Sequence, residues 1–227
     1  MRFQGIRYVH LLTLFVSASV TAISFLQLLV SYFEARASLY ETTFRLNYEN
    51  ALNMSVTMGS VFRSMESTLR GNANHIAEQA ERDNDLQPHV DHFMESNNFF
   101  NGILVVDAEG HVLAASDNLA GLNGTVIAEE AAKRALETRE PAISAPYRSR
   151  DGQPVVLMTH PIFDAAGEYM GYVGGTIHLS EPNVLKEIFG SRPVGDLGTY
   201  IYVVDSSGTI LYHPDPERPG DNVSSYP

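Results

Sequence analysis

The first feature of the chain is an apolar run near its N-terminus. Residues 8–33 read YVHLLTLFVSASVTAISFLQLLVSYF and contain no Asp, Glu, Lys or Arg. A helix needs about 20 such residues to span the hydrocarbon core of a bilayer, so we predict a transmembrane helix at 11–33 with the lipid bilayer as its partner. A cleaved signal peptide is the alternative, because SAS at 17–19 resembles a cleavage site, but the apolar run continues well beyond it.

A second apolar pattern, with helical spacing, follows the first. Residues 35–82 contain no proline, and apolar residues recur there at steps of three and four positions, as on one face of a helix. These residues are Met54, Met58, Val61, Met65, Leu69, Ala73, Ile76 and Ala80. We predict one helix of about 45 residues, about 68 Å long, that continues directly from the membrane span. Such a stripe packs along a domain or pairs with a second copy, so we expect a homodimer through this long helix.

Shorter patterns fill residues 83–190. Pro88 opens a short helix, Ile103–Val106 is an unbroken apolar run as in a buried strand, and Thr125 is predicted to cap a helix that ends near Glu137. The further elements that we expect are strands at Ile143–Tyr147, Val155–Phe163 and Tyr169–Leu179, and a helix capped by Ser180 that ends before Gly190. Strands joined largely by hairpins form an antiparallel sheet with the helices set apart from it, so we predict the α+β class.

One of these hairpins occurs twice. The sequence ILVVDAEGHVLAAS at 103–116 returns as IYVVDSSGTILYHP at 201–214. Asp107 and Asp205 each precede a glycine by three positions, so we interpret both as turn-forming residues. The repeat predicts a second module at 191–227 that contains only its first hairpin, which would be marginally stable alone. We therefore expect the chain to be either a piece of a longer protein or a truncated gene product.

Charge and composition narrow the possible functions. The 227 residues carry a formal net charge of -12, which argues against a nucleic-acid partner. The absence of cysteine excludes disulfides, thiolate metal ligands and a cysteine nucleophile. Arg2 and Arg7 precede the apolar run, so the positive-inside rule places residues 1–10 in the cytoplasm and the rest of the chain outside it.

At this point the chain resembles the double Cache (dCache) sensor domains of bacterial transmembrane receptors. The resemblance rests on the membrane anchor, the long helix, the two D-x-x-G hairpins, and the segments PAISAPY (141–147), PVVLMTHPIFDAAGEYMGYVGGTIHLS (154–180) and EPNVLKEIFG (181–190). It implies a PAS-like, membrane-distal ligand-binding module at 83–190, an incomplete membrane-proximal module at 191–227, and an extracytoplasmic position on the bacterial inner membrane.

The resemblance also bears on the output of such a receptor. The distal module is most similar to sensors that control a diguanylate cyclase, the enzyme that makes cyclic di-GMP. The input region of a chemoreceptor or of a sensor histidine kinase is the alternative. No GGDEF-type, P-loop or G-x-S-x-G motif occurs in the sequence, so we expect this chain to be a sensor without catalytic activity or a cofactor.

Amino-acid-sensing members of the family hold the ligand carboxylate with an arginine and its ammonium with two aspartates. Glu129 falls near the position of that arginine, Ser149 stands at the first aspartate position, and Thr176 takes the place of the second. The resemblance therefore implies a small-molecule ligand other than a standard amino acid.

Strand alternation supplies the candidate ligand-binding residues. Met158 and His160 share one face of their strand, and we expect His160 to line a pocket with tyrosine and threonine side chains from neighbouring strands. The full candidate set is Tyr147, Arg148, Met158, His160, Tyr172 and Thr176. A different class of function, an anchored periplasmic metal-dependent hydrolase, would use His89, Asp91 and His92, but two histidines three positions apart only begin a zinc site, and we expect no metal.

Overall fold

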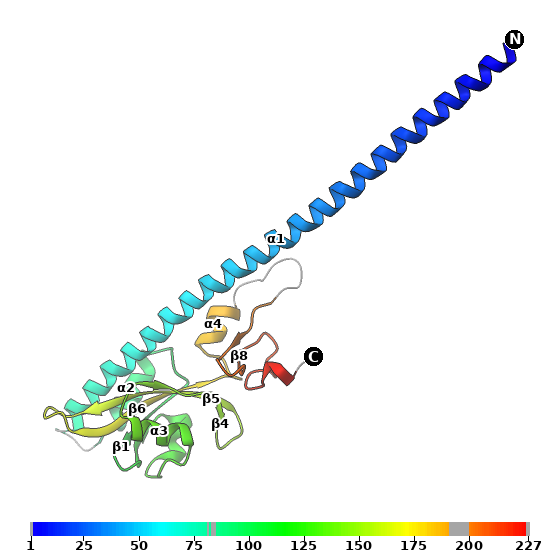
Figure 1. The fold of residues 1–227 in the computed structure, drawn as a ribbon. Coiled ribbons are helices and arrows are strands. Elements are labelled where there is room, and N and C mark those ends of the chain that lie inside the picture. Colours follow the sequence, from blue (N-terminus) through cyan, green and yellow to red (C-terminus); the bar gives the residue numbers. More distant parts are fainter. Residues whose placement is uncertain (1, 81, 83–84, 191–199, 226–227) are drawn as a thin grey trace. The chain divides into compact units, whose positions relative to one another are not determined.

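The computed structural model describes residues 2–80, 82, 85–190 and 200–225. The chain forms two compact units, residues 1–60 and residues 61–227. The first unit is part of a single helix, α1 (Arg2–Ala80), whose last turns belong to the second unit. The sheet and the other helices all lie in the second unit (Figure 1).

The N-terminal part of α1 carries exposed apolar side chains, as a helix in contact with lipid does. It is long and apolar enough to cross a bilayer, and large side chains such as Leu14 and Phe25 are more than half exposed. The hydroxyl of Ser17 donates to the Thr13 carbonyl at 2.8 Å, and that of Thr21 donates to the Ser17 carbonyl at 2.7 Å. These polar groups are thus satisfied within the helix, which a hydrocarbon environment demands.

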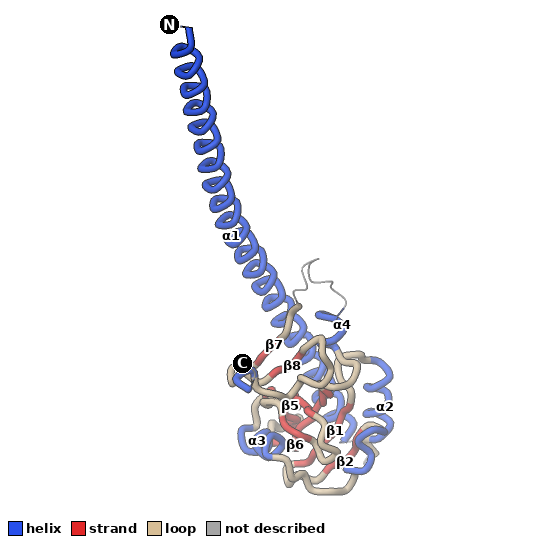
Figure 2. The backbone as a smooth tube through the Cα atoms, turned by 90° about the vertical axis from the view of Figure 1, so that its right-hand side faces the viewer, coloured by secondary structure: helices blue, strands red, loops and turns tan. Residues whose placement is uncertain are grey.

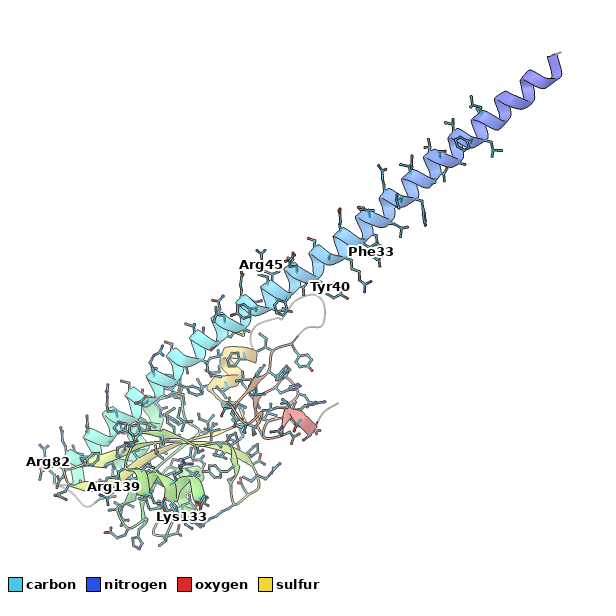
Figure 3. All side chains as sticks on the ribbon, in the orientation of Figure 1. Phe33, Tyr40, Arg45, Arg82, Lys133 and Arg139 are labelled. Atoms are coloured by element: carbon cyan, nitrogen blue, oxygen red, sulfur yellow. The ribbon has the colours of Figure 1, made fainter. Side chains whose placement is uncertain are left out.

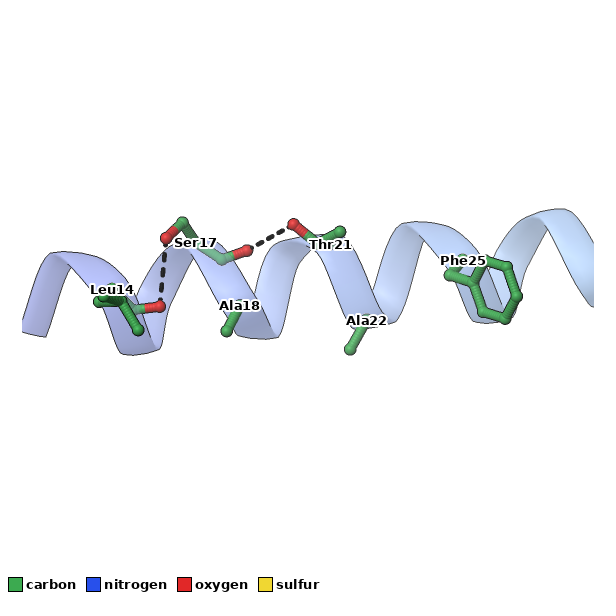
Figure 4. A pocket seen from close by; sticks show the side chains of 6 residues that line it. All are labelled: Leu14, Ser17, Ala18, Thr21, Ala22 and Phe25. Carbon is green, nitrogen blue, oxygen red and sulfur yellow. Dashed lines mark hydrogen bonds between the residues drawn. The ribbon is translucent and has the colours of Figure 1, made fainter.

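A shallow hollow runs along one side of this helix (Figure 4). It is lined by Leu14, Ser17, Ala18, Thr21, Ala22 and Phe25. Small side chains leave the backbone surface open there, which is typical of surfaces where membrane helices approach closely.

The last turns of α1 confirm the predicted apolar stripe. Met65, Leu69, Ala73 and Ile76 are at most 2% exposed. In Figures 1 and 2 these turns lie along the sheet of the second unit. The C-terminal half of the stripe is therefore part of a protein core.

The sheet is antiparallel, as predicted. Its strands are β1 (Gly102–Asp107), β2 (Val112–Ala115), β3 (Ala142–Ile143), β4 (Tyr147–Arg148), β5 (Pro154–Phe163) and β6 (Tyr169–His178). They follow the order β2-β1-β6-β5-β3, and β4 also pairs with β5. The remaining elements of this unit are α2 (Gln87–Ser96), the 3-10 helix η1 (Asp117–Leu122), α3 (Glu130–Thr138), α4 (Val184–Gly190), β7 (Val203–Val204), β8 (Ile210–Tyr212) and the 3-10 helix η2 (Val223–Ser225).

Each face of the sheet packs against different helices. Leu104, Leu157 and Tyr172 share one face and form a core with Ala132 and Ala135 of α3. We call this the α3 face. Ile103, Val105, Met158, Val173 and Ile177 are buried on the opposite face. Phe100 also lies on that opposite face, so tightly against Gly175 that a side chain at this glycine would displace its ring.

Three predicted element boundaries were wrong. Thr125 does not cap a helix, because its N–H bonds the Leu122 carbonyl and its own carbonyl accepts the N–H of Val112; α3 begins only at Glu130. The strand expected at 143–147 is split into β3 and β4, with Pro146, which has no N–H to donate, between them. The cap of α4 is Asn183 in place of Ser180, since its Oδ1 accepts the Lys186 N–H at 3.0 Å.

The repeat is present in the hydrogen bonds. Asp107 Oδ1 accepts the N–H groups of Glu109 and His111 at 3.0 and 2.7 Å. Asp205 Oδ1 accepts those of Ser207 and Thr209 at 2.9 and 2.8 Å. Both aspartates thus form turns, as predicted.

The likeness between the two copies extends beyond the hairpin. Ile127 N–H bonds the Gly110 carbonyl at 2.9 Å, and Val223 N–H bonds the Gly208 carbonyl at 2.9 Å. The second hairpin is also not unpartnered, contrary to expectation: Tyr212 is buried, and its ring centroid lies 5.4 Å from that of Phe189 in α4.

Candidate functional site

A tyrosine and a threonine on the α3 face have buried hydroxyl groups without hydrogen-bond partners in the described part of the chain. Tyr172, in β6, is 1% exposed, and Thr159, in β5, is 3% exposed. Neither Tyr172 OH nor Thr159 Oγ1 has a partner there. A buried polar group left unpaired costs about 1–3 kcal/mol, so this arrangement requires an explanation.

Glycine in β6 brings the two hydroxyl-bearing residues together. Gly174 is the cross-strand partner of Thr159. The ring of Tyr172 leans over this glycine, with its Cε2 atom 3.3 Å from where a Cβ of residue 174 would stand. A side chain at position 174 would occupy this space, so the glycine allows the tyrosine ring to lie next to Thr159.

Tyr147 and Glu129 complete a cluster around Tyr172. Burial, and then the nearby charge of Glu129, raise the pKa of Tyr147 to about 12. The pKa of Tyr172 is also raised, mainly by burial and further by Tyr147, Tyr169 and Glu129. Tyr147 packs against the core that contains Tyr172, and Glu129 stands at the start of α3, whose Ala132 and Ala135 belong to the same core. We call Glu129, Tyr147, Thr159 and Tyr172 the α3-face cluster.

The carboxylate of the cluster is held at the start of α3. Glu129 has extended backbone angles there (φ -66°, ψ 133°). Its Oε2 accepts the Ala128 N–H at 3.1 Å, and its Oε1 lies 3.4 Å from Nε of Arg150, which is half exposed. The ion pair is therefore accessible to solvent, and a ligand cation could compete with Arg150 for the carboxylate.

The structure divides the predicted site residues between the two faces. Tyr147, Tyr172 and Thr176 lie on the α3 face, but the Thr176 hydroxyl already donates to the Gly102 carbonyl at 3.2 Å. Met158 and His160 lie on the opposite face, because they flank Thr159 in β5. His160 therefore does not share a pocket wall with the tyrosines, contrary to our expectation.

Arg148 also lies away from the cluster. Its Nη1 donates to the Gly152 carbonyl at 2.8 Å, within the turn that joins β4 to β5. Its strand partner is Pro154, whereas Tyr147 is paired with Val155, so Arg148 and Tyr147 point to opposite faces. A role in ligand binding for any of the six predicted residues stays a prediction.

Thr159 and Glu129 were not among the candidate residues predicted from the sequence. Thr159 is a polar residue in a strand that is apolar on both faces, and this was the available signal. Glu129 was noted only as a departure from the amino-acid motif. In the structure it is a carboxylate near the buried Tyr172 and the half-buried Tyr147, so a negative charge stands where the motif would supply a positive one.

His89 and Asp91 of the hydrolase alternative have other partners. His89 Nδ1 lies 3.1 Å from Nε2 of His75 in α1. Asp91 accepts a hydrogen bond from Gln87 Nε2 at 2.8 Å. Within the described residues, no group of three His, Cys, Asp or Glu side chains is arranged to hold a metal ion.

The chain is similar to a known protein family and to several solved structures. The family model dCache_1, described as a Cache domain, matches residues 25–225. A search of curated protein sequences finds no match.

Solved structures give similarities at the level of the fold. An extracellular ligand binding receptor from Desulfohalobium retbaense is 20% identical with a TM-score of 0.61, and the alignment covers 74% of this chain but only 31% of that one. The ligand binding domain of the Pseudomonas aeruginosa amino acid chemoreceptor PctC, in complex with GABA, is 19% identical with a TM-score of 0.53 (73% and 74% covered). The extracellular domain of the putative histidine kinase mmHK1S-Z2 is 18% identical with a TM-score of 0.56 (75% and 73% covered).

Proposed function

Because the chain belongs to the Cache domain family, we propose that it is the ligand-sensing input region of a membrane-bound signal-transduction receptor. The sensor module, residues 83–190, lies outside the cytoplasm of a bacterium and is anchored in the inner membrane by α1. A ligand that binds one conformation better than another shifts the population between them. The helix that leaves the sheet for the membrane carries this shift.

The observation that carries the proposal is the pair of buried, unpartnered hydroxyls at Thr159 and Tyr172. A polar ligand between the sheet and α3 would supply their missing hydrogen bonds. Glu129 gives the cluster a negative charge, and the faces of tyrosine rings attract cations. We therefore expect a small ligand whose ammonium group, like that of GABA, replaces Arg150 as the partner of Glu129.

Thermal unfolding and calorimetry of the detergent-solubilised chain, with a panel of amines, amino acids and carboxylates, test this site. Tyr172→Phe removes one hydroxyl and keeps the ring, so we expect ligand affinity to fall roughly five- to tenfold. Tyr212→Phe, at a buried tyrosine outside the cluster, is the matched control and leaves affinity unchanged. Equal affinity in wild type and Tyr172→Phe, or binding of carboxylates alone, would refute this site.

The output of the receptor is a finer proposal. Chemoreceptors and histidine kinases carry sensor domains of the same fold. The diguanylate cyclase rests on the resemblance of the distal module alone, and we propose it beside these two outputs. The reading frame in which this sequence occurs tests the three outputs directly. A GGDEF-type domain in that frame supports the cyclase. A methyl-accepting coiled coil would indicate a chemoreceptor instead, and a kinase domain would indicate a sensor histidine kinase.

A further inference from the structure

Two histidines meet where α1 contacts α2. His75 Nε2 and His89 Nδ1 are 3.1 Å apart, and their ring centroids are separated by 5.0 Å at an interplanar angle of 72°. His75 is exposed and His89 is half buried. The residues that follow them, Ile76 and Val90, are at most 2% exposed. Packing of these neighbours fixes both backbones, so the two rings are held at the same point of the surface.

The separation of the two nitrogens matches the bite of a metal ion. Imidazole nitrogens bind zinc at about 2.0–2.1 Å, so two of them on one ion lie about 3.0–3.4 Å apart at angles between octahedral and tetrahedral. Neutral imidazole is also the preferred ligand of nickel and copper. In the absence of metal the same two nitrogens share a hydrogen bond, and a metal ion would replace it because both nitrogens must then be unprotonated.

We propose that His75 Nε2 and His89 Nδ1 bind one divalent transition-metal ion of the zinc, nickel or copper type. No third protein ligand completes the group among the described residues, so water fills the remaining positions. The site differs from the pairing of His89 with His92 that the sequence alone had indicated. It also lies outside the α3-face cluster and is independent of the proposed ligand.

The consequence would be a cross-link between two elements of the sensor. His75 lies on the helix that continues into the membrane-spanning segment, and α2, which carries His89, lies beside β1 and β2. A bound ion would stabilise the state in which α1 and α2 are in contact. Metal would therefore act on the sensor as a second signal.

Zinc titration of the full chain in detergent, carrying no polyhistidine tag, tests the proposal by thermal unfolding. We expect zinc to raise the melting temperature of the wild type, because a ligand that binds only the folded state stabilises it. His75→Gln and His89→Gln should each weaken zinc binding by roughly tenfold or more. His92→Gln, an exposed histidine one turn further along α2, is the matched control and should behave as the wild type.

Copper(II) spectroscopy gives a readout that a merely structural role would not change. Electron paramagnetic resonance should show coupling to two imidazole nitrogens in the wild type and in His92→Gln, but to one in each of the other variants. The proposal is overturned by a wild type that zinc does not stabilise, or by variants at 75 and 89 that retain full stabilisation and two-nitrogen coupling. Tyr172→Phe leaves metal binding intact, so failure of the ligand proposal and failure of this one are distinguishable.

Discussion

Two buried threonines on the α3 face differ in whether their hydroxyl group has a hydrogen-bond partner in the described part of the chain. Thr159 and Thr176 both lie on this face and are both buried, yet only Thr176 has a hydrogen-bond acceptor, the Gly102 carbonyl. Threonine thus makes a structural hydrogen bond at position 176, whereas at position 159 its hydroxyl group has no partner among the described residues. A group that the fold does not use is available to a ligand.

Threonine-to-valine substitutions test this distinction. Thr176→Val removes a hydrogen bond, so we expect the free energy of unfolding to fall by about 1 kcal/mol. Thr159→Val removes only an unpaired hydroxyl, so without ligand its stability should equal or exceed that of the wild type. Urea denaturation of both variants measures the difference. A loss at position 159 as large as that at 176 would mean that Thr159 has a structural partner.

At the scale of the element, one turn recurs in three hairpins, two in the six-stranded sheet and one in the two-stranded sheet of β7 and β8. Asp107, Asp164 and Asp205 each accept backbone N–H groups from the residues two and four positions later. In each case a glycine with positive φ follows three positions after the aspartate. The aspartate satisfies the backbone of the turn, and the glycine adopts a left-handed conformation that other residues rarely adopt.

Gly110 is the position where this turn can be tested most clearly. Its φ is 93°, and a Cβ there would lie 3.2 Å from Leu136. We expect Gly110→Ala to lower the free energy of unfolding by about 1–2 kcal/mol. Gly121→Ala is the control, because its φ is not positive and no atom lies within 4 Å of its Cβ position. Equal stability of the two variants in denaturant melts would contradict this account of the turn.

These turns explain which parts of the fold were predictable from sequence. The D-x-x-G pattern is local, so the hairpins and their repeat were predicted correctly. The placement of His160 was not, because β5 is apolar on both faces and alternation alone does not say which face receives Tyr172. That depends on the register between β5 and β6, which is set by packing. The cap at Thr125 failed for a related reason, since its backbone is used by β2.

At the scale of the molecule, α1 joins two environments. Between residues 33 and 44 it exposes aromatic side chains: Phe33, Tyr40 and Phe44 are each at least 60% exposed. Figure 3 labels Phe33 and Tyr40 on the helix. Tyr40 and Phe44 are one turn apart, and the charged residues Glu41 and Arg45 lie on the adjacent strip of the helix. The homodimer that we predict from the sequence would use this aromatic strip as its interface.

Disulfide cross-linking tests this pairing without interference, because the chain contains no cysteine. We expect Tyr40→Cys and Phe44→Cys to give cross-linked dimers in membranes under mild oxidation. Glu41→Cys and Arg45→Cys, one position further along, are matched controls on the charged strip and should cross-link weakly. Gel electrophoresis without reductant measures the fraction of dimer. Equal yields at all four positions would argue for random collision in place of a defined interface.

The sheet order has a consequence for how the chain assembles as it is made. β1 closes a hairpin with β2 at once, but its other edge pairs with β6, and Gly102 and Thr176 are 74 positions apart. An unpaired strand edge is prone to join other chains, and long-range strand pairing is slow. During synthesis β1 therefore waits with one open edge until β6 arrives, and this interval is where misassembly during export would begin.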